Sequence, residues 1–195
     1  IMTVQIGMQA GMENVVDTIK ALDISDDADP YAATALGSEE TTVSRLVAAY
    51  GALANHGRLN RPTVIDYVQD RKGKVIWRAD NRPCNGCNMA AYDGSAMPRF
   101  GIKGRQAMDA RTAFQIMHML QGVVSRGTAT VLNDLGLPLF GKTGTTSGPK
   151  DVWFIGGTQR LVAGAYVGFD RPRNMGGYAY GGTIAAPIIK DLIKS

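Results

Sequence analysis

One short stretch of the sequence, Leu139–Trp153, carries the residue types that could do chemistry. It reads LFGKTGTTSGPKDVW, and consecutive positions within it supply a cation, two hydroxyls and an unobstructed backbone: Lys142, Thr143, Gly144 and Thr145. Alternate side chains of a β-strand share a face, so Thr143 and Thr145 would point together and away from Lys142. Two adjacent hydroxyls can hold an anion, and the intervening glycine admits a ligand or another backbone. The pattern predicts a strand beside an anion-binding site, with an ordinary edge strand as the alternative.

The overlapping segment Gly136–Thr143 also matches GxxxxGK[ST], the pattern of a phosphate-binding loop. In such a loop a buried strand leads into a helix, and the backbone amides between them cradle the phosphates. Here Pro138 removes one amide, and the glycines that follow, Gly144 and Gly148, disfavour a helix. Nucleotide binding is therefore a rival interpretation that the local sequence argues against.

The KTGT stretch and the segments around it resemble the C-terminal part of the transpeptidase domain of bifunctional class A penicillin-binding proteins, which build bacterial peptidoglycan. The resemblance runs in order through nearly the whole chain: MTVQIG, GMENV, LVAAYGALANHG, MLQGVVSRGTA, GKTGTT, DVWFIGG and Gly181–Ile188. It implies an α+β fold of the penicillin-binding protein and serine β-lactamase type, here as a partial domain, with a mainly antiparallel sheet covered by helices.

The companion motifs of this family, SxxK and SxN, have no convincing match in the chain. The one SxxK match, Ser147–Lys150, reads SGPK, and its turn-like sequence with a proline differs from the rigid helix start that a nucleophile needs. No SxN or YxN occurs. In the family, SxN stands directly before the segment that MTVQIG resembles. The resemblance therefore implies that residues 1–195 are the C-terminal part of the domain and that the nucleophilic serine lies upstream of Ile1.

The resemblance also assigns roles to individual residues. Lys142 would complete a hydrogen-bonded network with the missing SxN serine and place a positive charge near the substrate's carboxylate. Thr143 and Thr145 would bind that carboxylate, and Gly144 and Thr146 belong to the same substrate-binding strand. The backbone N–H of Thr145 would form half of an oxyanion hole. The implied reaction is peptidoglycan D,D-transpeptidation through a covalent serine ester, which penicillin blocks, and the chain alone is expected to be inactive because it lacks the nucleophile.

The same resemblance implies peptidoglycan stem peptides, β-lactams and the N-terminal remainder of the protein as partners, and no cofactor. It implies a periplasmic location, with an inner-membrane anchor in a missing N-terminal segment. A serine β-lactamase shares the KTG motif and the fold, and a non-catalytic module that binds peptidoglycan is a third possibility. The length of the resemblance outside the motif favours the transpeptidase, and rapid penicillin hydrolysis would favour the β-lactamase.

Composition agrees with a globular domain and narrows the function classes. The chain has 195 residues, of which 45% are hydrophobic and 19% charged, enough for one domain with a core. Its net charge of +4 is mild and its basic residues are scattered, so nucleic acid is not an expected partner. No apolar run approaches the roughly 20 residues that cross a bilayer.

Hydrophobic spacing predicts the elements that would position the KTGT strand. The predicted helices cover Gly11–Leu22, a segment capped by Thr41 or Thr42 and ending at Asn55, Asp109–Ser125, a short segment ending at Leu135, and the segment after Gly181-Gly182. The predicted strands form a hairpin, Val64–Gln69 with Val75–Ala79, and a three-stranded antiparallel unit in which KTGT is followed by Val152–Thr158 and Leu161–Phe169.

Residues 83–104 form a long irregular stretch rich in proline and glycine, which predicts a surface loop or an insertion. Both cysteines, Cys84 and Cys87, lie in it as CNGC. A local disulfide in an oxidising periplasm is favoured over a redox pair or half of a metal site. A zinc site would need two further ligands, and His56 and His118 are far apart in the sequence and show no ligand spacing, so no metal is expected.

Overall fold

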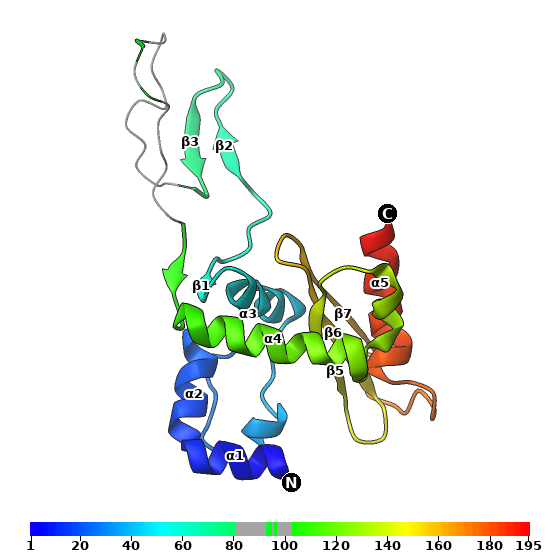
Figure 1. Cartoon of the computed structure of the whole chain (residues 1–195). Coiled ribbons are helices and arrows are strands. Elements are labelled where there is room, and N and C mark those ends of the chain that lie inside the picture. The colour runs from blue at the N-terminus through cyan, green and yellow to red at the C-terminus, as the bar shows by residue number, and fades with distance from the viewer. Residues whose placement is uncertain (81–92, 95, 97–102) are drawn as a thin grey trace.

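A computed structural model describes residues 1–80, 93–94, 96 and 103–195 (Figure 1). The predicted loop at about 83–104, including Cys84 and Cys87, lies almost entirely outside the described residues, so the disulfide stays a prediction. The main helices are α1 (Met2–Ala10), α2 (Met12–Ala21), α3 (Val43–Ala54), α4 (Ala110–Arg126) and α5 (Ala186–Lys194). Short helical turns are η1 (Thr34–Leu36), η2 (Thr130–Leu135) and η3 (Gly181–Ala185), the last a π-helical turn.

The predicted three-stranded antiparallel unit is confirmed. The strands β5 (Phe140–Thr145), β6 (Asp151–Gly157) and β7 (Val162–Gly168) lie in the order β5-β6-β7, and both pairs are antiparallel. The turn between β6 and β7 closes with a 2.8 Å hydrogen bond from Thr158 N to Leu161 O. The strand that carries KTGT is therefore an edge strand of the sheet.

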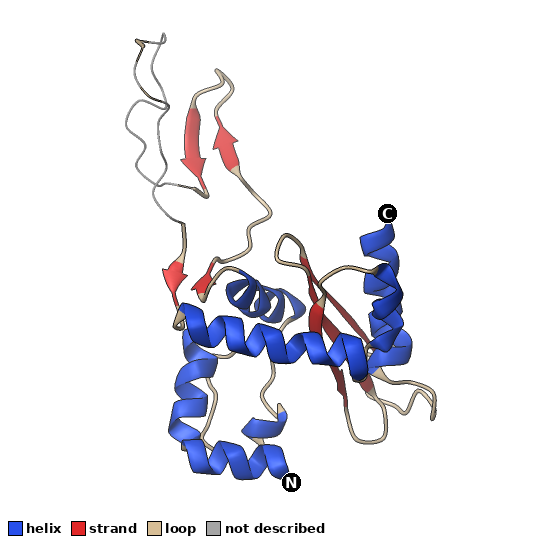
Figure 2. Ribbon diagram, viewed as in Figure 1, coloured by secondary structure: helices blue, strands red, loops and turns tan. Residues whose placement is uncertain are grey.

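Helices cover both faces of this sheet (Figure 2). Thr143, Phe154 and Ala165 are in register across the three strands and share the face that packs against α5. On the opposite face Gly164 lets α3 approach, because a Cβ there would lie 2.8 Å from Val47 Cγ2. The main core contains Val124, Ala129, Leu132, Leu139, Phe154, Ala165, Ala185, Ala186 and Ile189. The mainly antiparallel α+β architecture covered by helices is thus confirmed.

The predicted helices begin where their capping residues indicate. Thr42 accepts a hydrogen bond from Arg45 N at the start of α3, and Asp109 accepts one from Arg111 N at the start of α4. Helix α1 was not predicted from the sequence. In the structure the side chains of its residues Ile6 and Met8 are more than 60% exposed.

Two smaller pairs of strands lie on the side of the N-terminal end of α4, away from the main sheet (Figure 1). The predicted hairpin forms with shorter strands, β2 (Tyr67–Gln69) and β3 (Val75–Arg78), and stands away from the helices (Figure 2). Next to it, β1 (Arg58–Leu59) pairs with β4 (Arg105–Gln106). No helix within the described ranges is both long and apolar enough to span a membrane.

Glycine makes the close β5–β6 contact possible at Gly156. A Cβ at this position would lie 2.3 Å from Phe140 O and 2.6 Å from the Cα of Gly141, which are backbone atoms that cannot rotate away. We expect Gly156→Ala to lower the free energy of unfolding by about 1–3 kcal/mol. Gly51→Ala is the matched control, because Gly51 lies inside α3 with open space around its Cα.

Since alanine is the better helix former, Gly51→Ala should raise the free energy of unfolding by about 0.5–1 kcal/mol. Chemical denaturation followed by circular dichroism measures both changes. Equal effects of the two substitutions would show that the close backbone contact at Gly156 does not limit stability.

An ion pair between Lys190 and Asp134 ties α5 to η2, with 2.7 Å between Nζ and Oδ2. The hydrogen bond from Lys190 lowers the pKa of the Asp134 carboxyl from its ordinary value of 3.8. Because the folded-state pKa lies below the unfolded one, the stabilisation is present above the unfolded pKa and is lost as the pH falls through the folded pKa.

We therefore expect Asp134→Asn to lower the thermal unfolding midpoint at pH 7, with the difference shrinking once the pH falls below about 4. High salt should also shrink it, because both groups are near the surface. Asp191→Asn removes an exposed carboxylate from α5, the helix that carries Lys190, and is the control. A loss at pH 7 that persists unchanged into acid would contradict a role for this charge.

Candidate active site

The outer edge of β5 offers backbone groups to a ligand. No strand within the described residues pairs with that edge. On the inner side, Thr146 N donates to Asp151 O at 3.1 Å, and successive N–H groups of an antiparallel strand point in opposite directions. The N–H of Thr145 therefore points outwards, as does that of Thr143. The oxyanion donor expected at Thr145 is directed away from the sheet, towards the space where a substrate could lie.

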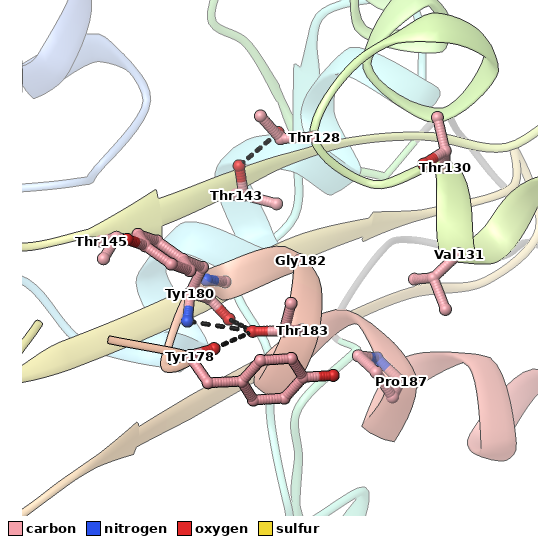
Figure 3. Close-up of a pocket in the computed structure, with 11 residues that line it drawn as sticks. Thr128, Thr130, Val131, Thr143, Thr145, Tyr178, Tyr180, Gly182, Thr183 and Pro187 are labelled. Carbon is pink, nitrogen blue, oxygen red and sulfur yellow. Dashed lines mark hydrogen bonds between the residues drawn. The ribbon is translucent and has the colours of Figure 1, made fainter. Parts of the chain in front are cut away.

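A pocket of about 450 Å³ opens beside the same strand (Figure 3). Seven of its eleven lining residues carry a hydroxyl group, and none of the described lining side chains is charged. The lining residues come from the end of α4, η2, β5 and the segment that leads into α5: Thr128, Thr130, Val131, Thr143, Thr145, Tyr178, Tyr180, Gly181, Gly182, Thr183 and Pro187. A pocket of this kind can orient an anion through neutral donors but needs a cation nearby to balance its charge.

Thr143 and Thr145 both face this pocket, as the alternation of side chains along β5 requires. Figure 3 shows the hydroxyls of Thr128 and Thr143 pointing towards one another, with 2.6 Å between the two Oγ1 atoms. The Oγ1 of Thr145 accepts a hydrogen bond from the N–H of Gly181 at 3.1 Å. The two threonine hydroxyls are thus held by two different elements across the pocket.

The close approach of η3 to the sheet depends on glycine. A Cβ at Gly181 would lie 2.3 Å from Trp153 O and 2.9 Å from Gly144 O, so a larger residue would push η3 away from β5. Gly181 thus permits close contact between the segment that begins the closing helix and the sheet. This contact forms one wall of the pocket.

Lys142 lies on the other face of β5 and does not line the pocket. Its ammonium donates to Thr143 O at 2.8 Å. The side chain is exposed, and Thr143 O points outwards because it alternates with the inward groups of its neighbours. The charge therefore lies at the open edge of the strand.

Thr146 also lies outside the pocket lining. Its hydroxyl accepts hydrogen bonds from the N–H groups of Lys150 and Asp151, both at 3.0 Å, and so holds the turn between β5 and β6. Ser147 of the SGPK match lies in that same turn rather than at the start of a helix. The structure brings together Thr143 and Thr145 of the predicted substrate-binding residues; the roles of Gly144 and Thr146 stay predictions.

Trp153 lies on the face of the sheet opposite Thr143. It packs against Tyr166 with ring centroids 4.7 Å apart. Tyr166 in turn donates to Asp151 Oδ1 at 2.7 Å, and this hydrogen bond raises the pKa of the Tyr166 phenol. Trp153 therefore supports the sheet behind the site and does not line the pocket.

Sequence reasoning missed the far wall of the pocket. Tyr178 and Tyr180 lie in an irregular segment without periodicity, which gives no local signal of a site. Thr183 shapes this segment: its Oγ1 donates to Tyr178 O and accepts from Tyr180 N. Thr128 belongs to the RGTA end of a segment that resembles the family. The closeness of that segment to KTGT in the sequence is the signal that could have placed Thr128 at the site.

The phosphate-binding loop that the nucleotide-binding interpretation requires does not form in this structure. After Lys142 and Thr143 the chain continues as a strand to Thr145 and then turns into β6. A phosphate-binding loop instead leads directly into a helix whose N-terminal amides face the phosphates. The GxxxxGK[ST] match therefore does not form that loop here.

Comparison with known proteins gives the family. The penicillin-binding protein transpeptidase domain family matches residues 4–194. Penicillin-binding protein 1A of Rickettsia bellii is 39% identical over 197 residues, an alignment that covers all of this chain and 25% of the relative. The chain thus spans about a quarter of the length of this curated relative.

Solved structures show the same fold. Penicillin-binding protein 1A from Haemophilus influenzae matches with a TM-score of 0.79 and 22% identity, over 100% of this chain and 32% of that one. The imipenem acyl-enzyme complex of penicillin-binding protein A from Mycobacterium tuberculosis matches with a TM-score of 0.66 and 16% identity, over 98% of this chain and 43% of that one. With its sequence matched over almost its entire length, the chain belongs to the penicillin-binding protein transpeptidase domain family.

Proposed function

We propose that residues 1–195 are the C-terminal part of a peptidoglycan D,D-transpeptidase domain whose nucleophilic serine lies in a segment outside this chain. The observation that carries the proposal is the arrangement at β5: an outward N–H at Thr145 next to a pocket into which Thr143 and Thr145 both point. Membership of the transpeptidase family supports it. The loop or insertion at about 83–104 belongs to the same domain.

The reaction is acyl transfer in two halves. The serine oxygen forms an ester with the acyl carbon of one stem peptide, and the amide bond to its terminal residue breaks as that residue leaves with a proton on its amine. An amine of a second stem peptide then attacks the ester, forms the cross-link and returns a proton to the serine. This chain contributes binding and electrostatic stabilisation to both halves.

The backbone N–H of Thr145 is one of two oxyanion donors, the other being the amide of the serine itself. It acts from a paired strand, so its direction is preorganised and costs no rearrangement during the reaction. One such donor typically stabilises the transition state by about 2.7–4 kcal/mol.

The terminal carboxylate of the stem peptide, or the carboxylate of a β-lactam, binds at the hydroxyls of Thr143 and Thr145. Lys142 supplies the positive charge that the pocket wall lacks. Its ammonium already lies at the open edge of β5, on the Thr143 carbonyl, where it can also meet the SxN serine of the missing segment. Hydrogen bonds to charged groups are worth about 1.5–3 kcal/mol, so this lysine is a major contributor to the site.

β-Lactams are proposed as inhibitors that acylate the same serine. The acyl-enzyme complex of penicillin-binding protein A with imipenem supports this for a protein of the same fold. Because the matched relative is itself a penicillin-binding protein, we favour transpeptidation over the serine β-lactamase and the non-catalytic module. The N-terminal remainder of the protein would complete the site and anchor it at the periplasmic face of the inner membrane, where Cys84 and Cys87 can form a disulfide.

Replacing Lys142 tests the assignment of the site. In the complete gene product, Lys142→Ala should lower the second-order rate constant for acylation by benzylpenicillin by about 10- to 150-fold, since it removes a charge-assisted interaction. The rate is measured by quenching at timed intervals and quantifying the penicilloyl adduct by mass spectrometry.

Lys150→Ala removes the same charge from the neighbouring exposed turn and should leave the acylation rate unchanged. Both variants should unfold at the same temperature as the unmodified protein. Acylation of Lys142→Ala at the unmodified rate would show that this lysine is not part of the site.

A further inference from the structure

We propose that Thr128 is a positioning residue for the carboxylate site, because it fixes the direction of the Thr143 hydroxyl. The two Oγ1 atoms are 2.6 Å apart and both side chains line the pocket (Figure 3). The inference rests on the proposed function, in which Thr143 binds the carboxylate of the substrate. It adds Thr128, from the turn that follows α4, to the two β5 threonines proposed to bind the carboxylate.

The backbone on both sides of Thr128 is held in place by the fold. Its neighbour Ala129 is fully buried, and the N–H of Ala129 donates to Val123 O at 3.0 Å. On the other side, Gly127 has no room for a side chain, since a Cβ would lie 2.8 Å from the Cα of Val123. Thr128 therefore enters the pocket from a turn with little freedom to move.

The opposite wall of the pocket also contacts this residue. A Cβ at Gly182 would lie 2.1 Å from the carbonyl oxygen of Thr128, so these two backbones touch. The segment that leads into α5 thus meets Thr128 through Gly182 and Thr145 through Gly181. The hydrogen bonds of the Thr143 and Thr145 hydroxyls therefore both lie beside one closely packed junction.

The number of protons on a hydroxyl determines which threonine donates in the Thr128–Thr143 hydrogen bond when a carboxylate is bound. A threonine hydroxyl has one proton to donate and two lone pairs with which to accept. A carboxylate can only accept, so Thr143 can bind it only if its own proton is not already donated to Thr128. Thr128 must then donate to Thr143, and the bound anion selects the order Thr128 to Thr143 to carboxylate.

Such a chain has two effects on recognition. Thr128 turns the Thr143 proton towards the substrate before binding, and each hydrogen bond in a chain polarises the next. Thr128 acts through Thr143 and does not touch the substrate. Its contribution should therefore vanish when Thr143 has no hydroxyl or when the ligand has no carboxylate.

The test uses the complete gene product and measures the rate of acylation by benzylpenicillin and by its methyl ester, in which the carboxylate is masked. Thr128→Val, which keeps the shape but removes the hydroxyl, should lower the rate with benzylpenicillin by about 2- to 12-fold. The rate with the methyl ester should not change. Thr128→Ser should restore the rate with benzylpenicillin.

Two further variants separate positioning from other roles. In a Thr143→Val background, adding Thr128→Val should cause no further loss, whereas a residue that itself touched the carboxylate would give an additional loss. Thr112→Val makes the same substitution at an exposed position near the start of α4 and should leave both rates unchanged.

The ratio of the two rates within one variant is insensitive to a partly misfolded sample, because both rates scale with the active fraction. If Thr128→Val does not fold, the rates with benzylpenicillin and with its methyl ester are compared in Thr128→Ala instead. An unchanged ratio in Thr128→Val, or a further loss in the Thr143→Val background, overturns the inference. Absence of any acylation in the unmodified protein would instead overturn the proposed function.

Discussion

The antiparallel pairing of β5 with β6 is the constraint on which the rest of the structure depends. It orients the N–H of Thr145 outwards and sends the side chains of Thr143 and Thr145 to the same side. Glycines at the points of closest approach, Gly156 within the sheet and Gly181 against it, let backbone pack on backbone. A one-residue shift in this register would turn both hydroxyls away from the pocket and the N–H of Thr145 into the sheet.

The architecture around that pair was predictable because each part has a local cause in the sequence. Two apolar runs separated by Gln159-Arg160 leave few options other than a hairpin, and Thr42 and Asp109 have the side chains that cap helices. The period of a strand alone was enough to place Thr143 and Thr145 on one face of the KTGT strand. These local patterns do not indicate a reaction. Only the family resemblance suggested which reaction the strand would take part in.

The far side of the pocket could not be predicted, because its residues gain their meaning only through tertiary contacts. Thr128 meets Thr143 across a turn at the end of α4, and Tyr178 and Tyr180 are held by Thr183 in a segment without regular structure. The position of the Lys142 ammonium on the Thr143 carbonyl likewise depends on rotamers, which the strand period does not determine. Helix α1 was not predicted, and Ile6 and Met8 on it are exposed in the structure.

The central claim is that this chain supplies the electrostatic half of a serine acyl-transfer site whose nucleophile lies elsewhere in the protein. Intact-mass spectrometry after incubation with benzylpenicillin, followed by peptide mapping, tests it most directly. We predict a stable adduct on the complete gene product, at a serine outside residues 1–195, and no adduct on this chain incubated alone. An adduct on Ser147 or another serine within these residues, or no adduct on the complete product, would contradict the claim.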